Sequence, residues 1–363
     1  MAELSRLQIE TALKEIQDRY LEKNLVAADE VKDIRIDGGK VAVELAFGYP
    51  AKGYFAEVEA AVRERVGRVA GVSAVEVTST SKVVAHAVQR NLKPLAGIKN
   101  IIAVASGKGG VGKSTTAVNL ALALAAEGAR VGILDADIYG PSQPRMLGID
   151  GKPETKDGRM LEPMENYGLK AMSIGFLIDA ETPMIWRGPM VTQALEQLLN
   201  ETRWGDLDYL VIDLPPGTGD IQLTLSQKIP VSGAVIVTTP QDIALLDARK
   251  GLKMFEKVEV PVLGIVENMS IHICSKCGHE ERIFGEGGGQ RMADDYHVEF
   301  LGALPLDIRI REQADGGKPT VVADPQGRVT EIYREIARRT AAHLAQKAKD
   351  FSSKFPNIVI QNN

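Results

Sequence analysis

The segment at residues 101–116, IIAVASGKGGVGKSTT, constrains the fold of this chain more than any other. It begins with an apolar, β-branched run that predicts a buried strand, and a helical pattern follows from Lys113. Between them Gly107, Gly112, Lys113 and Ser114 satisfy the spacing G-x-x-x-x-G-K-[ST] in a strand–loop–helix setting. Glycines let backbone N–H groups turn toward phosphates, while the helix N-terminus and Lys113 add positive charge. The sequence therefore predicts a nucleotide site.

Lys108 narrows the class of this loop. With it the loop reads GKGGVGKST, which resembles a deviant Walker A loop, whose early lysine reaches across a dimer interface to the partner's nucleotide. A solvated loop lysine is the alternative. Ser114 is expected to offer its hydroxyl to Mg²⁺ on the phosphates. The nucleotide-binding residues expected in the loop are Gly107, Lys108, Gly109, Gly110, Val111, Gly112, Lys113, Ser114 and Thr115.

Two later strands end in carboxylates. Residues 130–134 lead into Asp135 and Asp137, and residues 208–214 contain Asp213. In an alternating strand–helix pattern the carboxyl ends of parallel strands form the ligand edge of the sheet. Asp135 and Asp213 are therefore expected to hold Mg²⁺ and its water beside the phosphates. A helix cap or a turn is the alternative role for such carboxylates.

Two more residues at strand ends are expected to contact the nucleotide. Gly217, in the loop PPGTGD behind Asp213, could offer its N–H to the γ-phosphate, although the loop could also be a rigid proline turn. Asn268 closes the strand at residues 262–267, and its amide presents both a donor and an acceptor to a nucleobase.

The chain has two cysteines, Cys274 and Cys277, spaced C-x-x-C six residues after Asn268. No signal peptide is visible, so a metal or redox role is favoured over a structural disulfide. Closed zinc sites and common iron–sulfur clusters take four protein ligands. Either His272 and His279 complete a zinc site in one chain, or two chains pool their cysteines. A thioredoxin-like pair is the weaker alternative, and the dimer implied by Lys108 favours pooling.

Composition limits the partners. The net charge of −5 gives no reason to expect nucleic acid or an anionic membrane surface as a partner. No apolar run approaches the length of a membrane span, and a cytoplasmic protein is expected.

The chain divides into four parts. The pattern predicts a small α/β domain at residues 1–85, a linker at 86–97, a doubly wound, mainly parallel α/β P-loop NTPase domain at 98–350, and a tail at 351–363. In the small domain, helical spacing over residues 7–20 precedes a hairpin, a helix at 54–69 and a strand at 74–78. This order resembles the small domain of iron–sulfur assembly factors. Members often carry a cysteine after the hairpin, but this loop reads FGYP, so docking or regulation is expected.

Seven motifs in order resemble the Mrp/ApbC family of P-loop ATPases, the bacterial iron–sulfur cluster carrier proteins. They are GKGGVGKST, LDADIYGPS, WRGPM, VIDLPPGTGD, TTPQDIAL, ENMS and C-x-x-C, spread over residues 98–325. The resemblance implies ATP hydrolysis by a homodimer that sandwiches two nucleotides. It also implies a bridging [4Fe–4S] cluster on Cys274 and Cys277, received from an assembly scaffold and transferred to apo-proteins. The catalytic residues implied are Lys113, Lys108 acting in trans, and Asp137, which would orient the attacking water.

Two rival functions share parts of this pattern. A positioning ATPase of the chromosome-partition type would use the deviant loop but gives no reason for C-x-x-C. A regulatory NTPase stabilised by zinc would use the cysteines only as structural ligands.

Overall fold

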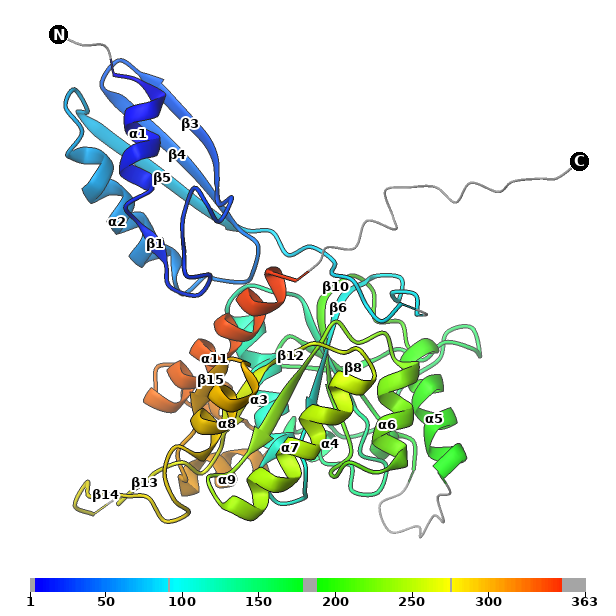
Figure 1. The fold of residues 1–363 in the computed structure, drawn as a ribbon. Coiled ribbons are helices and arrows are strands. Elements are labelled where there is room, and N and C mark those ends of the chain that lie inside the picture. The colour runs from blue at the N-terminus through cyan, green and yellow to red at the C-terminus, as the bar shows by residue number, and fades with distance from the viewer. Residues whose placement is uncertain (1–3, 91, 179–187, 275, 348–363) are drawn as a thin grey trace, which may run out of the picture.

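The computed structural model describes residues 4–90, 92–178, 188–274 and 276–347 (Figure 1). The expected tail at 351–363 and Trp186 of the WRGPM motif lie outside the described residues. No helix among the described residues is long and apolar enough to cross a membrane.

The N-terminal part folds around a three-stranded sheet of order β3-β4-β5. β3 and β4 form an antiparallel hairpin that turns at Gly38, whose φ is 56°, and β5 pairs parallel to β4 after the crossover helix α2. Val58, Val62 and Val66 recur every fourth residue and bury one face of α2. The elements are α1 (Arg6–Leu13), β1 (Gln17–Asp18), β2 (Lys23–Asn24), β3 (Val31–Asp37), β4 (Lys40–Phe47), α2 (Phe55–Gly67) and β5 (Ala74–Ser81).

The first helix is shorter than its periodicity predicts. α1 ends at Leu13, and Tyr20 lies beyond it in a turn. The buried Asp18 carboxylate accepts the backbone N–H groups of Tyr20 and Leu21 at 2.7 and 3.0 Å. An Asp side chain that bonds nearby backbone amides competes with helix formation, so the turn replaces the expected last helical turn.

The larger part is built on an eight-stranded sheet of order β15-β12-β11-β6-β10-β7-β9-β8, in which only the β8–β9 pair is antiparallel. The elements up to β10 are β6 (Ile98–Ala105), α3 (Lys113–Ala126), β7 (Val131–Asp135), α4 (Gln143–Met146), β8 (Met164–Asn166), β9 (Leu169–Ser173), the 3₁₀ turn η1 (Ile174–Phe176), α5 (Gly188–Asn200) and β10 (Leu207–Asp213). Those that follow are α6 (Asp220–Lys228), β11 (Gly233–Thr238), α7 (Asp242–Lys257), β12 (Val262–Glu267), β13 (His272–Ile273), β14 (Glu280–Glu281), α8 (Gly288–Tyr296), β15 (Phe300–Ala303), α9 (Ile308–Asp315), α10 (Thr320–Ala323) and α11 (Arg328–Ala345).

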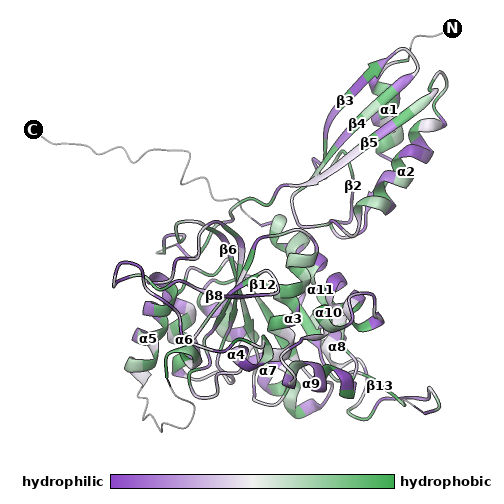
Figure 2. Ribbon diagram, turned by 180° about the vertical axis from the view of Figure 1, so that it is seen from behind, coloured by the Kyte–Doolittle hydropathy of each residue, from purple (hydrophilic) through white to green (hydrophobic). Residues whose placement is uncertain are grey.

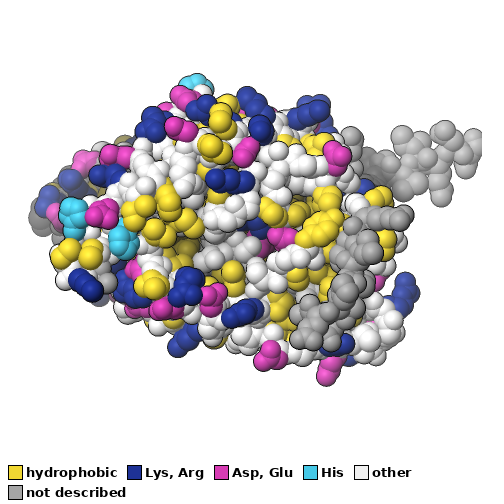
Figure 3. Space-filling model, turned by 90° about the horizontal axis from the view of Figure 1, so that it is seen from below, with side chains coloured by type: hydrophobic (Ala, Val, Ile, Leu, Met, Phe, Trp, Pro, Cys, Tyr) yellow, Lys and Arg dark blue, Asp and Glu magenta, His cyan; other side chains and the backbone are white. Residues whose placement is uncertain are grey.

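Helices cover both faces of this sheet, which confirms the predicted doubly wound P-loop architecture. α3 and α11 contact each other and the strands on one face, and α7 and α8 contact β11, β12 and β15 on the other. Every residue of β7, β10 and β11 is buried, including the aspartates of β7 and β10, because helices cover both faces of this sheet. The strands in the interior of the larger part are largely hydrophobic (Figure 2). The carboxyl ends of the strands meet at the lower edge of Figure 1, the face that Figure 3 views directly. The loops that follow β6, β7, β10, β11 and β12 therefore share one surface.

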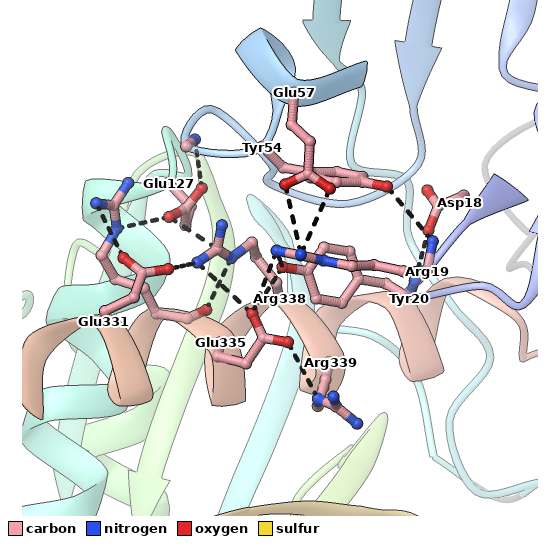
Figure 4. Close-up of polar contacts among 12 residues, drawn as sticks. Asp18, Arg19, Tyr20, Tyr54, Glu57, Glu127, Glu331, Glu335, Arg338 and Arg339 are labelled. Atoms are coloured by element: carbon pink, nitrogen blue, oxygen red, sulfur yellow. Dashed lines mark hydrogen bonds and ion pairs between the residues drawn. The ribbon is translucent and has the colours of Figure 1, made fainter. Parts of the chain in front are cut away.

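The N-terminal sheet docks on the opposite end of the larger part, through a polar interface with α11 and the end of α3 (Figure 4). The C-cap of α3, Glu127, is fully buried. Its carboxylate accepts the Gly53 N–H at 2.7 Å and the Arg334 Nε–H at 2.7 Å. The Tyr20 hydroxyl donates to Glu335 of α11 at 2.8 Å, and the Arg338 guanidinium lies 5.6 Å from the centre of the Tyr20 ring. The two parts are thus joined by hydrogen bonds to the buried Glu127 and to Glu335, and by the contact of Arg338 with the Tyr20 ring.

Candidate nucleotide site and cysteine hairpin

The P-loop connects the central strand β6 to the N-terminus of α3. Gly112 is the N-cap of α3 and has a φ of 81°, which a residue with a side chain rarely adopts. A Cβ on Gly107 would lie 2.1 Å from the backbone carbon of Asp247, so this glycine lets α7 pack directly on the loop. These two motif glycines are therefore fixed by backbone geometry, independently of any bound phosphate.

The Lys113 ammonium lies between two groups predicted to hold Mg²⁺. It pairs with the Asp213 carboxylate, which is fully buried at the end of β10, and lies 3.2 Å from the Ser114 hydroxyl. Lys113 itself is buried apart from 6% of its side-chain surface. The structure thus brings Lys113, Ser114 and Asp213 together as the sequence predicts, with the ammonium as the cation between the two oxygen groups.

Gln143, on α4, belongs to this cluster although the sequence analysis did not single it out. Its Nε2 donates to Asp213 Oδ2 at 2.9 Å and to the Ser114 carbonyl at 3.1 Å. Its Oε1 is buried without a hydrogen-bond partner among the described residues. Gln143 directly follows the motif LDADIYGPS, but no spacing rule links it to Asp213, 70 residues later.

The Asp135 carboxylate accepts hydrogen bonds from its own loop and from the end of β9. It accepts the backbone N–H groups of Asp137, Ser142 and Gln143 at 3.1, 2.9 and 3.0 Å, and the Ser173 hydroxyl at 3.2 Å. Burial, and then the nearby Asp213 charge, raise the pKa of Asp135 to about 7. This carboxylate therefore shapes the loop after β7, and its contact with Mg²⁺ stays a prediction.

The loop that Asp135 shapes presents Asp137 at the same edge. Asp137 is partly exposed and accepts the Gly140 N–H at 3.3 Å, and burial raises its pKa. Its carboxylate is therefore more accessible than that of Asp135, which suits the predicted role in orienting water.

Two predicted nucleotide contacts are engaged within the protein. The Gly217 N–H donates to the Ser106 carbonyl at 3.0 Å, so it would have to leave that bond to reach a γ-phosphate. The Asn268 Nδ2 donates to the Val111 carbonyl of the P-loop at 2.9 Å, and a Cβ on Gly112 would lie 2.1 Å from that nitrogen. Asn268 therefore holds the P-loop in place, and its contact with a base stays a prediction.

Lys108 lies in the loop without a carboxylate partner in the described part of the chain. Only its backbone carbonyl is engaged, as the acceptor of the Ser106 hydroxyl at 2.9 Å. The residue is half-buried, and the reach of its side chain to another subunit stays a prediction.

The two cysteines lie at the tip of a hairpin formed by β13 and β14, which projects at the lower left of Figure 1. The Cys274 N–H donates to the His279 carbonyl, and the Gly278 N–H donates to the Cys274 carbonyl at 2.8 Å. Gly278 has a φ of 72°, which closes the turn. Backbone N–H groups of Lys276 and Cys277, followed by the Cys277 side chain, lower the pKa of the Cys274 thiol. Donors aimed at a sulfur stabilise a thiolate, the form that binds metal.

The single-chain zinc site does not form among the described residues, where no group of three or more His, Cys, Asp or Glu side chains is placed to hold a metal. His272 Nδ1 instead lies 3.1 Å from the Leu306 carbonyl, and His279 lies 3.9 Å from Glu281. Both cysteines are free, and Cys277 is exposed.

Large apolar side chains are exposed around this site. Figure 3 shows apolar side chains across the face at the carboxyl edge, with many charged ones along its rim. The exposed apolar residues that follow strand ends on this face are Tyr139, Ile243, Leu246, Ile283 and Ile308. Such a patch beside a nucleotide loop is typical of a protein interface.

Comparison with protein families gives one match for each part of the chain. Residues 97–341 match the family described as NUBPL iron-transfer P-loop NTPase, and residues 6–78 match the family described as iron–sulfur cluster assembly protein.

Individual proteins agree with these matches. The iron–sulfur cluster carrier protein of Escherichia coli strain K12 is 52% identical over 94% of this chain and 93% of its own length. That of Pseudomonas fragi is 63% identical over 74% of this chain and 94% of its own length. A nucleotide-binding protein of Archaeoglobus fulgidus, solved in complex with ADP, is 40% identical, with a TM-score of 0.55 over 64% of this chain and 90% of that one.

Proposed function

Because this chain belongs to the Mrp/ApbC family of P-loop iron–sulfur cluster carrier proteins, we propose that it hydrolyses ATP as a homodimer and carries a [4Fe–4S] cluster between the two subunits. The cluster is cargo, received from an assembly scaffold and passed to apo-proteins. One observation supports this more than any other. The strand that ends beside the P-loop at Asn268 continues directly into the hairpin with Cys274 and Cys277.

In this proposal the P-loop binds the phosphates of ATP through its backbone N–H groups and the N-terminus of α3. Lys113 leaves Asp213 and meets the β- and γ-phosphates, where its charge stabilises the transition state. Asp137 orients the attacking water, and Lys108 of the other subunit reaches the developing charge. The ADP complex of the Archaeoglobus fulgidus relative supports nucleotide binding at this fold.

The residues present fit Mg²⁺. Ser114 and Asp213 already share a cation, the Lys113 ammonium, and the unpaired Gln143 Oε1 lies on the side chain bonded to Asp213. A hydroxyl, a carboxylate and an amide oxygen are hard donors of the kind that Mg²⁺ and its water shell prefer. When bound, the ion would neutralise charge on the phosphates as Lys113 turns toward them.

The cluster site needs two chains. Each subunit supplies two thiols on a projecting hairpin, and four thiolates complete the usual ligand set of a [4Fe–4S] cluster. The exposed apolar side chains on the same face would be covered when two such faces meet.

The deciding experiment is metal analysis of protein purified without oxygen. We expect about four iron and four acid-labile sulfide ions per dimer. Replacing Cys274 or Cys277 by alanine should abolish stable cluster binding while ADP binding is retained. Zinc in place of iron would favour the regulatory NTPase, and a metal-free protein with full ATPase activity would favour the positioning ATPase.

A further inference from the structure

Glu267, the last residue of β12, hydrogen-bonds the chain on both sides of the segment that carries the two cysteines. It is buried apart from 1% of its surface. Its Oε1 accepts the Ser270 hydroxyl at 2.6 Å, and its Oε2 accepts the Gly289 N–H at 2.6 Å. Ser270 precedes the excursion of residues 271–288 that carries the cysteines, and Gly289 follows it on the first turn of α8. One carboxylate thus links the two ends of the excursion, whose first residues are also held by backbone hydrogen bonds with Leu304 and Leu306.

Asn268, the next residue in the chain, contacts the P-loop instead of the cysteine hairpin. Asn268 donates to the Val111 carbonyl of the P-loop, as described above. Two adjacent side chains at the end of one strand therefore hold the cysteine hairpin and the nucleotide loop separately. A buried strand is a stiff element, so the spacing of these two attachments is fixed by β12 itself.

We propose that Glu267 is a positioning residue for the metal hairpin, which sets the direction in which Cys274 and Cys277 face a second subunit. It acts through Ser270 and Gly289 and touches no metal. The proposal rests on the proposed function, because it assigns the cysteines to a shared cluster. Groups that hydrogen-bond metal ligands directly typically change metal affinity 10- to 100-fold when removed, and Glu267 acts one step further away, so an effect at the lower end of that range is expected.

Two substitutions separate hydrogen bonding from charge. Glu267→Ala removes both acceptors. Glu267→Gln keeps them in modified form, since the amide oxygen can accept the Gly289 N–H while the NH₂ group donates to the Ser270 oxygen. Asp208→Asn is the matched control. Asp208 is also a buried strand carboxylate of this sheet, but it lies at the amino end of β10, where it binds Lys99 and Arg130.

The experiment measures iron loss to a chelator from the reconstituted full-length dimer, and amide hydrogen exchange of residues 271–288 in the metal-free protein. We expect Glu267→Ala to lose iron about tenfold faster and to exchange faster in that segment only. Glu267→Gln and Asp208→Asn should stay within about twofold of the wild type, and ADP affinity should be unchanged in all three.

The outcomes are distinguishable. Wild-type iron loss and wild-type exchange in Glu267→Ala would overturn the positioning role, and so would a Glu267→Gln protein as defective as the alanine variant. Faster exchange throughout the sheet of Glu267→Ala would also overturn it, because the residue would then support the fold in general. If Cys274→Ala retains its iron as well, the proposed function fails instead.

Discussion

At the scale of single residues, the nucleotide site is held together by a cation that belongs to the protein. Lys113 occupies the position between Asp213 and Ser114 where charge is otherwise uncompensated. A buried carboxylate without a partner is costly, so Lys113 stabilises the free protein, in addition to the catalytic role proposed for it.

Lys113→Ala is therefore expected to have two effects. ATP hydrolysis should fall by at least about 100-fold, because the charge that meets the transferring phosphoryl group is lost. The free energy of unfolding should fall by about 3 kcal/mol, because the fully buried Asp213 carboxylate keeps only the Gln143 amide as a partner. Phosphate release and a thermal melt measure the two effects. Wild-type turnover would exclude the proposed catalytic role of this lysine.

A second prediction at this scale concerns Glu30, a buried acid directly before β3 in the N-terminal part. Burial, and then the neighbouring Asp18 carboxylate, raise the pKa of Glu30 to about 10. Asp18 already accepts three hydrogen bonds, from the Tyr49 hydroxyl at 2.5 Å and from two backbone N–H groups. With its pKa raised in this way, Glu30 carries a proton at neutral pH. Because the folded-state pKa is raised, this group adds stability at low pH that is lost as the pH rises toward 10.

Glu30→Gln should remove that dependence. From pH 6 to pH 8 the free energy of unfolding of the wild type should fall by up to about 1.4 kcal/mol per pH unit relative to the variant. Urea unfolding of both proteins at pH 6, 7 and 8 measures the difference. A difference that is constant with pH would show that Glu30 is ionised in the folded protein.

At the scale of elements, α3 spans from the nucleotide site to the domain interface. It begins at Lys113 in the P-loop, and its C-cap Glu127 is bound by Gly53 and Arg334. The N-terminal part therefore contacts the C-terminal end of the helix whose N-terminus follows the P-loop. The role of the small domain in docking or regulation stays a prediction.

Glu127→Ala should release this contact. The substitution leaves the Arg334 Nε–H and the Gly53 N–H without their acceptor, which we expect to cost about 3 kcal/mol. Limited proteolysis should then cut between Ser81 and Ile98 faster than in the wild type. Glu57→Ala is the control, since the pair of Glu57 with Arg19 is largely exposed and should contribute less than about 1 kcal/mol. Equal cleavage of both variants would argue against Glu127 as the anchor.

At the scale of the whole molecule, the amino ends and the carboxyl ends of the strands carry different groups. The amino-edge side carries the N-terminal sheet, and the carboxyl edge carries the P-loop, the cysteine hairpin and the exposed apolar side chains. The proposed dimer would join two carboxyl edges, which leaves both N-terminal parts free to meet other proteins.

Mixing Lys108→Ala with Asp137→Ala protein tests this dimer. If Lys108 acts in trans, the subunit that lacks it keeps its own Asp137 and receives the lysine of the other subunit. Equal random mixing should then recover about a quarter of wild-type ATPase activity from two nearly inactive variants. No recovery, with mixed dimers demonstrated by native mass spectrometry, would place Lys108 in cis.

The sequence by itself determined the parts of this protein that follow from local patterns. Apolar runs alternating with helical patterns predicted the doubly wound sheet, which the structure confirms, because strand and helix periodicity depends on near neighbours. The rule that parallel strands end at one edge predicted that Lys113, Ser114 and Asp213 would meet, and they do.

Only the tertiary structure decided which side chains complete these groups. Gln143 binds Asp213, Asn268 binds the Val111 carbonyl 157 residues earlier, and Arg334 binds Glu127 across 207 residues. Hydrogen bonds over such separations depend on how strands and helices pack, and no spacing rule along the chain encodes them. The same holds for Glu267: its position at a strand end was visible in the sequence, but its two partners on either side of the cysteine hairpin were not, because they become neighbours only when the chain returns to β12.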